Sequence, residues 1–295
     1  MHSALDLCFK FPEKLKNWNI NSNSIIVLAA KDEEELYNFG KELERKNILH
    51  SKFFEPDVAY ELTSIAIVPD NGIKKLCSRF PLAGKKQTSS GCIKDILELK
   101  WEFISKMNEC EQTKGMSVLD HGLSVWEALE SIRNILEGKE TEKDYKLPEW
   151  LINNSDKFLK TFYEIGEYAL RKYTILHDIG KPFCRTVDEN GKVHFPDHAK
   201  ESVKTWERIS YNSKTDNLIS KLIAEDMDIH LLRPKDAIIY KQTHDFWMIQ
   251  LMVGLSELHA NSKMFGGIES DGFKIKYKYL DKCGARMLLD SEANK

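Results

Sequence analysis

The residues with the clearest chemical potential are the adjacent His177 and Asp178, in the stretch TILHDIGKP at 174–182. The apolar run before them predicts a buried helix, and Gly180 and Pro182 predict that this helix ends there. An imidazole and a carboxylate would then project together from the end of a buried element. Neutral imidazole and carboxylate oxygen are ligands that divalent metal ions accept, so this pair indicates a metal site.

Other histidines in the C-terminal part could complete such a site. Seven of the nine histidines follow residue 120, at positions 121, 177, 194, 198, 230, 244 and 259. A single histidine on a helix usually fills a core or surface position, but several at helix ends and in short loops favour a shared site. His177 and Asp178, with two or three of the others, could bind one divalent ion, or two ions bridged by Asp178. Such a site lowers the pKa of bound water and binds a phosphoryl oxygen, and Lys181 is close enough to face a phosphate.

Composition limits the classes of protein that remain. The chain has 295 residues, 42% hydrophobic and 30% charged, which indicates a globular protein of one large or two ordinary domains. Its net charge of −3 gives no overall attraction to nucleic acid, although a local basic patch is allowed. No apolar run reaches the roughly 20 residues of a membrane span, and we expect no signal peptide and no membrane partner. The six scattered cysteines have the pattern of reduced, buried thiols in a cytoplasmic protein.

The first 83 residues alternate between strand and helix patterns. Asp32 predicts a helix start, because three glutamates follow it and an apolar face continues to about residue 47. The other expected elements are a short helix at 3–9, a buried strand at 24–30, and strands at 50–56 and 62–68. We therefore expect a small N-terminal α/β layer domain over residues 1–83.

The rest of the chain has helical spacing, after a segment of linker composition at 84–94. Residues 266–295 form a tail, and its alternating basic and aromatic residues, Phe273 to Leu280, suit either a nucleic-acid contact or an amphipathic surface element. We expect an all-α domain over residues 95–295, and therefore an α+β protein overall. The expected helices are 93–104, 117–136, 158–176, 202–209, 218–223 and 246–264, with one strand at 192–195.

The N-terminal elements carry a first resemblance. Their order, together with FEPD at 54–57 followed by LTSIAI at 62–67, resembles the type 2 peptidyl-tRNA hydrolase fold over residues 1–83. The resemblance implies that Asp57 and Thr63 bind substrate, although Asp57 also suits a turn after Pro56 and Thr63 an ordinary strand position. Since the Lys-bearing segment of that family would precede His2, the resemblance implies a domain that holds tRNA or another ligand, or a scaffold.

Three C-terminal segments carry a second resemblance, to the HD-domain metal phosphohydrolases. They are SVLDHGL at 117–123, LHDIGKP at 176–182 and GKVHFPDHAKES at 191–202, and they are similar to the HD domains attached to CCA-adding tRNA nucleotidyltransferases. The resemblance covers about residues 100–265. It implies that His121, His177 and Asp178 bind a metal ion, and that His198 and His230 serve a second metal ion or a phosphate.

One position departs from the pattern of that family. The family closes its site with an Asp in an Ala-Asp-x-x-Ala pattern on the last helix, where we place Asn261 of this chain. The amide oxygen of Asn261 can ligate a metal ion without adding charge, and Glu257, one turn earlier, could substitute for it. His194 matches no ligand position, and we expect it to face solvent on a strand.

Two functions are compatible with these residues. The first is a divalent-metal-dependent phosphohydrolase, a phosphatase or phosphodiesterase that acts on a nucleotide or on an RNA or tRNA end. It would use manganese, nickel, magnesium, cobalt or iron, with Asp178 and Lys181 as catalytic residues and Lys181 also binding the substrate. The alternative is a non-catalytic nucleotide- or RNA-binding module with a degenerate metal site. A third, weaker interpretation gives the N-terminal domain an esterase activity of its own.

Overall fold

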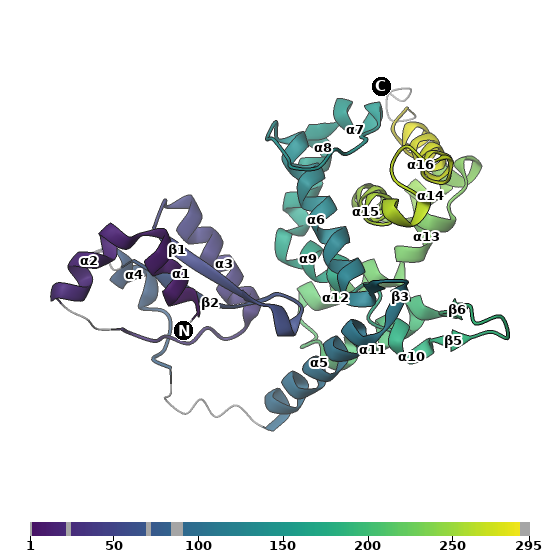
Figure 1. Cartoon of the computed structure of the whole chain (residues 1–295). Coiled ribbons are helices and arrows are strands. Elements are labelled where there is room, and N and C mark those ends of the chain that lie inside the picture. The colour runs from purple at the N-terminus through teal and green to yellow at the C-terminus, as the bar shows by residue number, and fades with distance from the viewer. Residues whose placement is uncertain (1, 22–24, 69–71, 84–90, 290–295) are drawn as a thin grey trace. The chain divides into compact units, whose positions relative to one another are not determined.

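Helices predominate in the computed structural model, which describes residues 2–21, 25–68, 72–83 and 91–289 (Figure 1). The chain divides into two compact units, Met1–Trp101 and Glu102–Lys295, and the division falls inside helix α5, Gly91–Glu109. The expected linker at 84–94 lies partly outside the described residues, and its last four residues belong to α5. Small antiparallel sheets beside many helices make an α+β protein with a mostly helical C-terminal unit.

Unit 1 is built on an antiparallel hairpin of strands β1 and β2, with a register shift between Phe53 and Phe54. Successive side chains of a strand point to opposite faces. Ser64 of β2 contacts Ser3 of α1, and the neighbouring Ile65 packs on the core of Phe39 and Leu43 from α3, so the two helices cover opposite faces. The elements of unit 1 are α1 (His2–Lys10), α2 (Pro12–Asn21), α3 (Glu33–Arg45), β1 (His50–Glu55), η1 (Pro56–Val58), β2 (Glu61–Ile67) and α4 (Ile73–Cys77).

The expected helix start at Asp32 is confirmed. The Asp32 carboxylate accepts a hydrogen bond from the Glu35 backbone N–H at 2.8 Å, which satisfies one of the open donors of the first turn. The expected buried strand at 24–30 is wrong for the residues described there. Ile25 and Ile26 are exposed, and the segment makes only an isolated bridge, from Leu28 to Leu82. An apolar, β-branched run favours extended backbone, but a strand also needs a partner along its length, and here only Leu28 forms a bridge.

Unit 2 is a helical domain with two very short hairpins, β3–β4 and β5–β6. Helix α15 is buried around its whole circumference from Ile249 to His259, which is the mark of a central helix. Helix α6 packs against both α15 and α9, and Figure 1 shows α6 beside α9. Helices α8, α13 and α16 also contact α15, and α12 contacts α9.

The elements of unit 2 after α5 are β3 (Glu111–Thr113), β4 (Met116–Ser117), α6 (Val118–Leu136), α7 (Glu149–Asn153), α8 (Ser155–Ile165), α9 (Glu167–Leu176), α10 (Lys181–Cys184), β5 (Thr186–Val187), β6 (Val193–His194), α11 (His198–Ile209), α12 (Lys214–Ala224), α13 (Asp226–Leu231), η2 (Pro234–Asp236), α14 (Ala237–Thr243), α15 (Trp247–Ala260), η3 (Ser262–Phe265) and α16 (Asp271–Leu289).

Two expectations for this unit need correction. The single helix expected at 158–176 is two helices, α8 and α9, because Gly166 between them adopts a positive φ of 92°, which interrupts the helical hydrogen bonds. The expected tail is the long helix α16, whose Phe273 and Met287 are completely buried and which packs on α14 and α15. Its Ile275 and Tyr279 are exposed, so the amphipathic element is the alternative that the structure favours.

None of the helices in the described ranges is both long enough and apolar enough to cross a lipid bilayer. Among the five cysteines whose side chains are described, Cys110 and Cys283 are buried, as expected of small apolar residues, whereas Cys8 is exposed.

Close helix contact in unit 2 depends on Gly122. A Cβ atom at this position of α6 would lie 2.2 Å from the backbone oxygen of Ile175 in α9. We expect Gly122→Ala to lower the free energy of unfolding by about 3 kcal/mol, because backbone must shift to make room. Gly272→Ala is the matched control, since its Cβ would meet Phe265 at an ordinary 3.5 Å. Thermal and denaturant unfolding measure the difference, and equal stability of the two variants would contradict the close packing of α6 on α9.

Candidate metal centre

His121 is positioned by the start of helix α6. Ser117 and Asp120 form a reciprocal capping box there, in which Asp120 N–H donates to Ser117 Oγ and Ser117 N–H donates to Asp120 Oδ2. The cap fixes the first residue of the helix, so His121 lies one turn inside it. The neighbouring Gly122 lets α9 approach, and the rings of His121 and His177 lie 5.3 Å apart. The His121 side chain is almost fully buried.

His177 and Asp178 follow the last residue of helix α9, as the sequence predicted. The loop after them is held down at Gly180, whose N–H donates to Ser202 Oγ of α11 and whose missing Cβ would lie 2.2 Å from the Ser202 nitrogen. His177 Nδ1 lies 2.8 Å from the backbone oxygen of Thr174. Because a carbonyl can only accept, Nδ1 carries the hydrogen and Nε2 is left to face Asp178 and Glu257.

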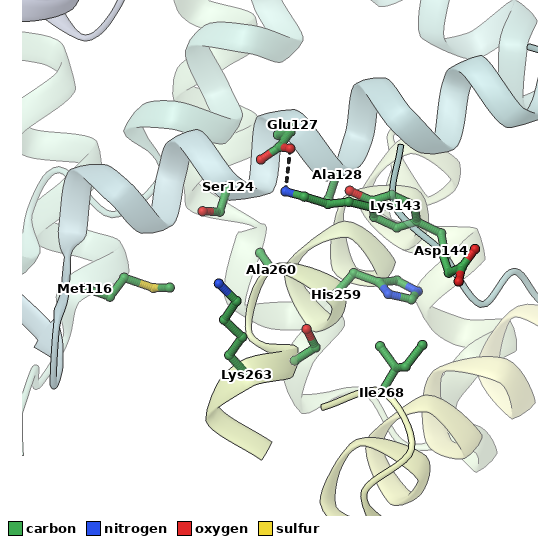
Figure 2. Close-up of a pocket in the computed structure, with 12 residues that line it drawn as sticks. Met116, Ser124, Glu127, Ala128, Lys143, Asp144, His259, Ala260, Lys263 and Ile268 are labelled. Carbon is green, nitrogen blue, oxygen red and sulfur yellow. Dashed lines mark hydrogen bonds and ion pairs between the residues drawn. The ribbon is translucent and has the colours of Figure 1, made fainter. Parts of the chain in front are cut away.

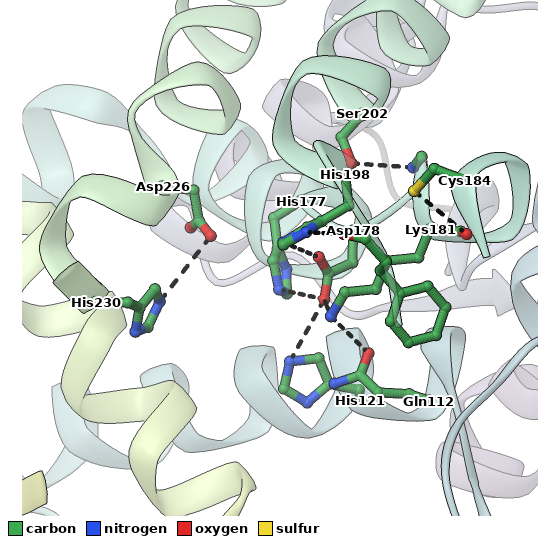
Figure 3. A network of polar contacts seen from close by, with 12 residues as sticks. Gln112, His121, His177, Asp178, Lys181, Cys184, His198, Ser202, Asp226 and His230 are labelled. Carbon is green, nitrogen blue, oxygen red and sulfur yellow. Dashed lines mark hydrogen bonds and ion pairs between the residues drawn. The ribbon is translucent and has the colours of Figure 1, made fainter. Parts of the chain in front are cut away.

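Figure 3 shows the Asp178 carboxylate in the middle of this network. Its Oδ2 atom lies 3.1 Å from His177 Nε2, 3.8 Å from His121 Nε2 and 2.5 Å from Lys181 Nζ. Its Oδ1 atom lies 3.6 Å from Nε2 of His198, the first residue of α11. The Nδ1 atom of His198 lies 3.0 Å from the Phe195 carbonyl, so its free nitrogen also faces the carboxylate.

Glu257 of α15 joins the cluster, where the sequence placed Asn261 with Glu257 as its possible substitute. The Oε2 atom of Glu257 lies 4.0 Å from His121 Nε2. Its Oε1 atom lies 3.8 Å from His177 Nε2 and 3.1 Å from His230 Nε2. Asn261 caps the end of α15, one turn further, and its buried Oδ1 has no hydrogen-bond partner. A weak signal was in the sequence, because Ser256-Glu257-Leu258-His259-Ala260 matches Ala-Asp-x-x-Ala with Ser for the first Ala and Glu for Asp.

Asp226 is a residue of the cluster that the sequence did not single out. It begins helix α13, and His230 lies one turn later on the same helix, with 4.0 Å between Asp226 Oδ2 and His230 Nε2. Two sets of donor atoms are close enough to hold a metal ion: His121, His177 and Glu257 form one, and Asp226, His230 and Glu257 form the other. His230 is the exposed member, whereas the other four are buried.

The charges of the cluster alter the pKa values of its members. Burial lowers the pKa of His121 to about 4, so this imidazole is neutral at neutral pH. Burial alone would also lower the pKa of His177, but the carboxylates of Asp178 and Glu257 raise it to about 10. The His230 residue is exposed overall, but its side chain is only 29% exposed and this partial desolvation opposes a charge, yet Glu257 and Asp226 raise its pKa to about 9. Without a metal ion, protons on His177 and His230 thus offset the buried carboxylates.

The residues fit a divalent cation on two observations. Metal ions such as zinc hold nitrogen and oxygen ligands at about 2.0–2.2 Å, so ligand atoms around one ion are roughly 3–4 Å apart. The separations in the first set, 3.8 Å and 4.0 Å from Glu257 to the two histidines, lie in this range. Moreover, the buried Glu257 Oε1 receives no hydrogen bond of good geometry and has only imidazole nitrogens near it, His230 Nε2 at 3.1 Å and His177 Nε2 at 3.8 Å, so it is available as a metal ligand.

Lys181 is held beside the cluster by three contacts. Its ammonium group contacts Asp178, donates to Gln112 Oε1 at 3.0 Å and lies 5.5 Å from the centre of the Phe195 ring. The side chain is mostly buried but keeps some access to solvent. A cation in this place can neutralise an anionic group that reaches the cluster, as the sequence predicted.

The remaining expected residues lie elsewhere. Thr63 is an exposed residue of β2 in unit 1, and Asp57 lies in η1, with its side chain outside the described part. Thr63 is not a member of either set of metal-binding residues. His194 is exposed on β6, as expected, and pairs with Asp188 at 2.8 Å. His244 and His259 contact Asp228 and the Lys146 carbonyl, respectively.

A pocket begins one helical turn from the ligands. Ser124 follows His121 by three residues on α6, and Ala260 follows Glu257 by three residues on α15, a rise of about 4.5 Å along each axis. Figure 2 shows the ammonium groups of Lys143 and Lys263 directed toward the Ser124 side of this pocket. Lys143 pairs with Glu127, whereas Lys263 has no ion pair within the described part of the chain.

No protein-family model, curated protein or solved structure matches this chain.

The pKa values predict how metal binding depends on pH. At neutral pH a metal ion must displace the proton from His177, whose pKa is about 10, and from His230, whose pKa is about 9. The affinity of the metal-free protein for a divalent ion should therefore rise with pH until these values are passed, and binding should release protons. Calorimetric titration in buffers of different ionisation enthalpy counts those protons. His194→Gln should change nothing, and an affinity that does not depend on pH would contradict the assignment.

Proposed function

We propose that this protein is a divalent-metal-dependent phosphohydrolase that acts on a phosphate monoester or diester of a nucleotide or of an RNA end. The observation that carries the proposal is the buried group of His121, His177, Asp178 and Glu257, with the Lys181 ammonium beside it. Burying several carboxylates and imidazoles together costs folding free energy, so a cluster of this kind is more readily explained by a functional site than by stability. The resemblance of segments 117–123, 176–182 and 191–202 to HD-domain enzymes supports the same class.

The chain's own residues suit phosphoryl chemistry. A divalent ion bound here would lower the pKa of water and polarise a phosphoryl oxygen. Lys181 would neutralise a second phosphoryl oxygen, and Gln112 would keep its ammonium group directed at the site. His198 is partly exposed and has a free Nε2 beside Asp178, so it can exchange a proton with a leaving group.

The pocket shown in Figure 2 supports a substrate larger than phosphate. None of the cluster residues lines it, but Ser124 lies one turn from His121 on α6, and Lys263 and Tyr145 are also in its lining. A cation, a hydroxyl group and an aromatic ring are groups that contact the phosphate, sugar and base of a nucleotide. On this basis, and from the two resemblances to tRNA-handling families, we infer that the substrate is a nucleotide or an RNA end. We also propose a cytoplasmic location.

Turnover of a small substrate panel tests the proposal. We expect the protein, supplied with manganese, nickel or magnesium, to release phosphate or p-nitrophenol from at least one of four classes: a generic phosphodiester, 2′,3′-cyclic nucleotides, nucleoside monophosphates and nucleoside triphosphates. Asp178→Asn should lower kcat roughly 10²–10³-fold, because the carboxylate contacts both histidines and Lys181. His194→Gln, on the exposed hairpin, is the matched control and should retain full activity. Bound metal without turnover on the whole panel would favour the binding-module alternative.

Lys181 gives a separate prediction, because it can be removed without removing a metal ligand. In Lys181→Met the chain loses the cation that contacts Asp178 Oδ2, so metal content should be at least that of the wild type. The rate kcat should fall roughly 10²-fold, since the phosphoryl charge loses its partner. Metal analysis and steady-state kinetics on the same preparation separate the two effects. A variant with unchanged kcat would show that Lys181 has only a structural role.

A further inference from the structure

We propose that a second divalent ion binds at Asp226, His230 and Glu257, and that the Glu257 carboxylate bridges it to the ion at His121 and His177. This inference rests on the metal centre of the proposed function and extends it, because it sets the number of ions, names Asp226 as a ligand and assigns the bridge to Glu257. The sequence suggested Asp178 as the bridging residue.

The second set of donors comes from two elements that meet at α15. Asp226 and His230 lie one turn apart on the same face of α13, and α13 packs on α15, which carries Glu257. His230 Nε2 lies 3.1 Å from Glu257 Oε1 and 4.0 Å from Asp226 Oδ2. These separations match those of ligands around one ion, and a nitrogen with two carboxylate oxygens is a donor set that manganese, iron and zinc accept.

Asp226 is oriented by a buried hydrogen bond. The Tyr173 hydroxyl, completely buried in α9, donates to Asp226 Oδ1 at 2.5 Å. This bond occupies one carboxylate oxygen and leaves Oδ2 to face His230, as Figure 3 shows for the pair. A hydrogen-bonded partner behind a ligand is the usual support of metal-binding carboxylates. Tyr173 is therefore a positioning residue for the second ion.

Glu257 is the carboxylate that both donor sets share. Its Oε2 atom is near His121, and its Oε1 atom is near His230 and His177. Asp178 has four cationic or imidazole neighbours, namely His121, His177, Lys181 and His198, and among the described residues no ion pair joins it to His230 of the second set. Oε1 lies closer to His230 (3.1 Å) than to His177 (3.8 Å), and only Oε2 lies near His121, so Glu257 can bind one ion on the His121 side and share Oε1 with an ion on the His230 side.

The two ions would differ in access to solvent. The side chains of His121 and His177 are only 2% and 3% exposed, whereas the His230 side chain is 29% exposed. We therefore expect the ion at His121 and His177 to be retained during dialysis and the ion at His230 to exchange with solvent. The exchangeable ion is the one that a phosphate from solution would meet first.

Metal counting and spin coupling test the inference on the full chain. The protein would be stripped with a chelator and titrated with manganese, while elemental analysis counts the ions and electron paramagnetic resonance detects exchange coupling. We expect two manganese ions per wild-type chain, with a coupled spectrum, because ions that share a carboxylate lie about 4 Å apart. Asp226→Asn should bind one ion, and its spectrum should be that of an isolated ion.

Two further variants make the test specific. Asp228→Asn is the matched control, since Asp228 lies on the same helix but is exposed and contacts His244 instead. This variant should still bind two coupled ions. Tyr173→Phe keeps every ligand and should weaken only the second ion, about 10-fold, through the lost hydrogen bond. It also keeps the inference testable if Asp226→Asn does not fold, which circular dichroism would show.

Each outcome separates this inference from the proposed function. A single ion at saturation in the wild type, or two uncoupled ions, would overturn the bridged pair even if the protein hydrolyses phosphate esters. Two coupled ions in Asp226→Asn would equally exclude Asp226 as a ligand. Two coupled ions that depend on Asp226, in a chain without turnover on the substrate panel, would uphold the inference and count against the hydrolase.

Discussion

The burial of the Asp178 carboxylate is the constraint on which the rest of unit 2 depends. A carboxylate that is only 2% exposed costs several kcal/mol unless charges or hydrogen bonds offset it. Here the compensation comes from Lys181 at the start of α10 and from histidines on α6, at the end of α9 and on α11. These positive or polar groups hold the pKa of Asp178 well below its usual range, against the effect of burial. Three segments of the chain must therefore meet at one point for the fold to be stable.

Two glycines allow that meeting. Gly122 brings the backbones of α6 and α9 into contact, and Gly180 brings the loop after α9 onto the start of α11. In both places a Cβ atom would lie 2.2 Å from a backbone atom of the neighbouring element. The separations of about 3 to 4 Å within the cluster thus depend on backbone contacts, which are far more rigid than the long side chains of surface ion pairs.

Shared use of Glu257 connects stability with function. Its buried carboxylate belongs to an inner group with His121 and His177 and to an outer group with Asp226 and His230. In the metal-free protein, protons on His177 and His230 compensate the acidic charges, and a divalent cation would replace them. The same arrangement that makes the acidic groups tolerable in the core therefore makes the protein ready to bind metal.

The features that the sequence by itself determined are local ones. The cap at Asp32 and the end of a helix just before His177 depend on residues within one or two turns, and both appear in the structure. A helix break at Gly166 and the exposure of Ile25 were not predicted, because apolar spacing does not reveal a positive φ or the absence of a strand partner.

The composition of the cluster was decided only by the tertiary structure. Glu257 and Asn261 lie one turn apart on α15, so the sequence could place both near the site but could not say which carboxyl or amide group reaches the histidines. The rotation of α15 against α6 selects Glu257. Asp226 belongs to no motif that could be recognised in the sequence, and it joins the cluster because α13 packs on α15. Spacing along the chain fixes which residues share a helix face, whereas the crossing of helices that are distant in sequence fixes which of those faces meet.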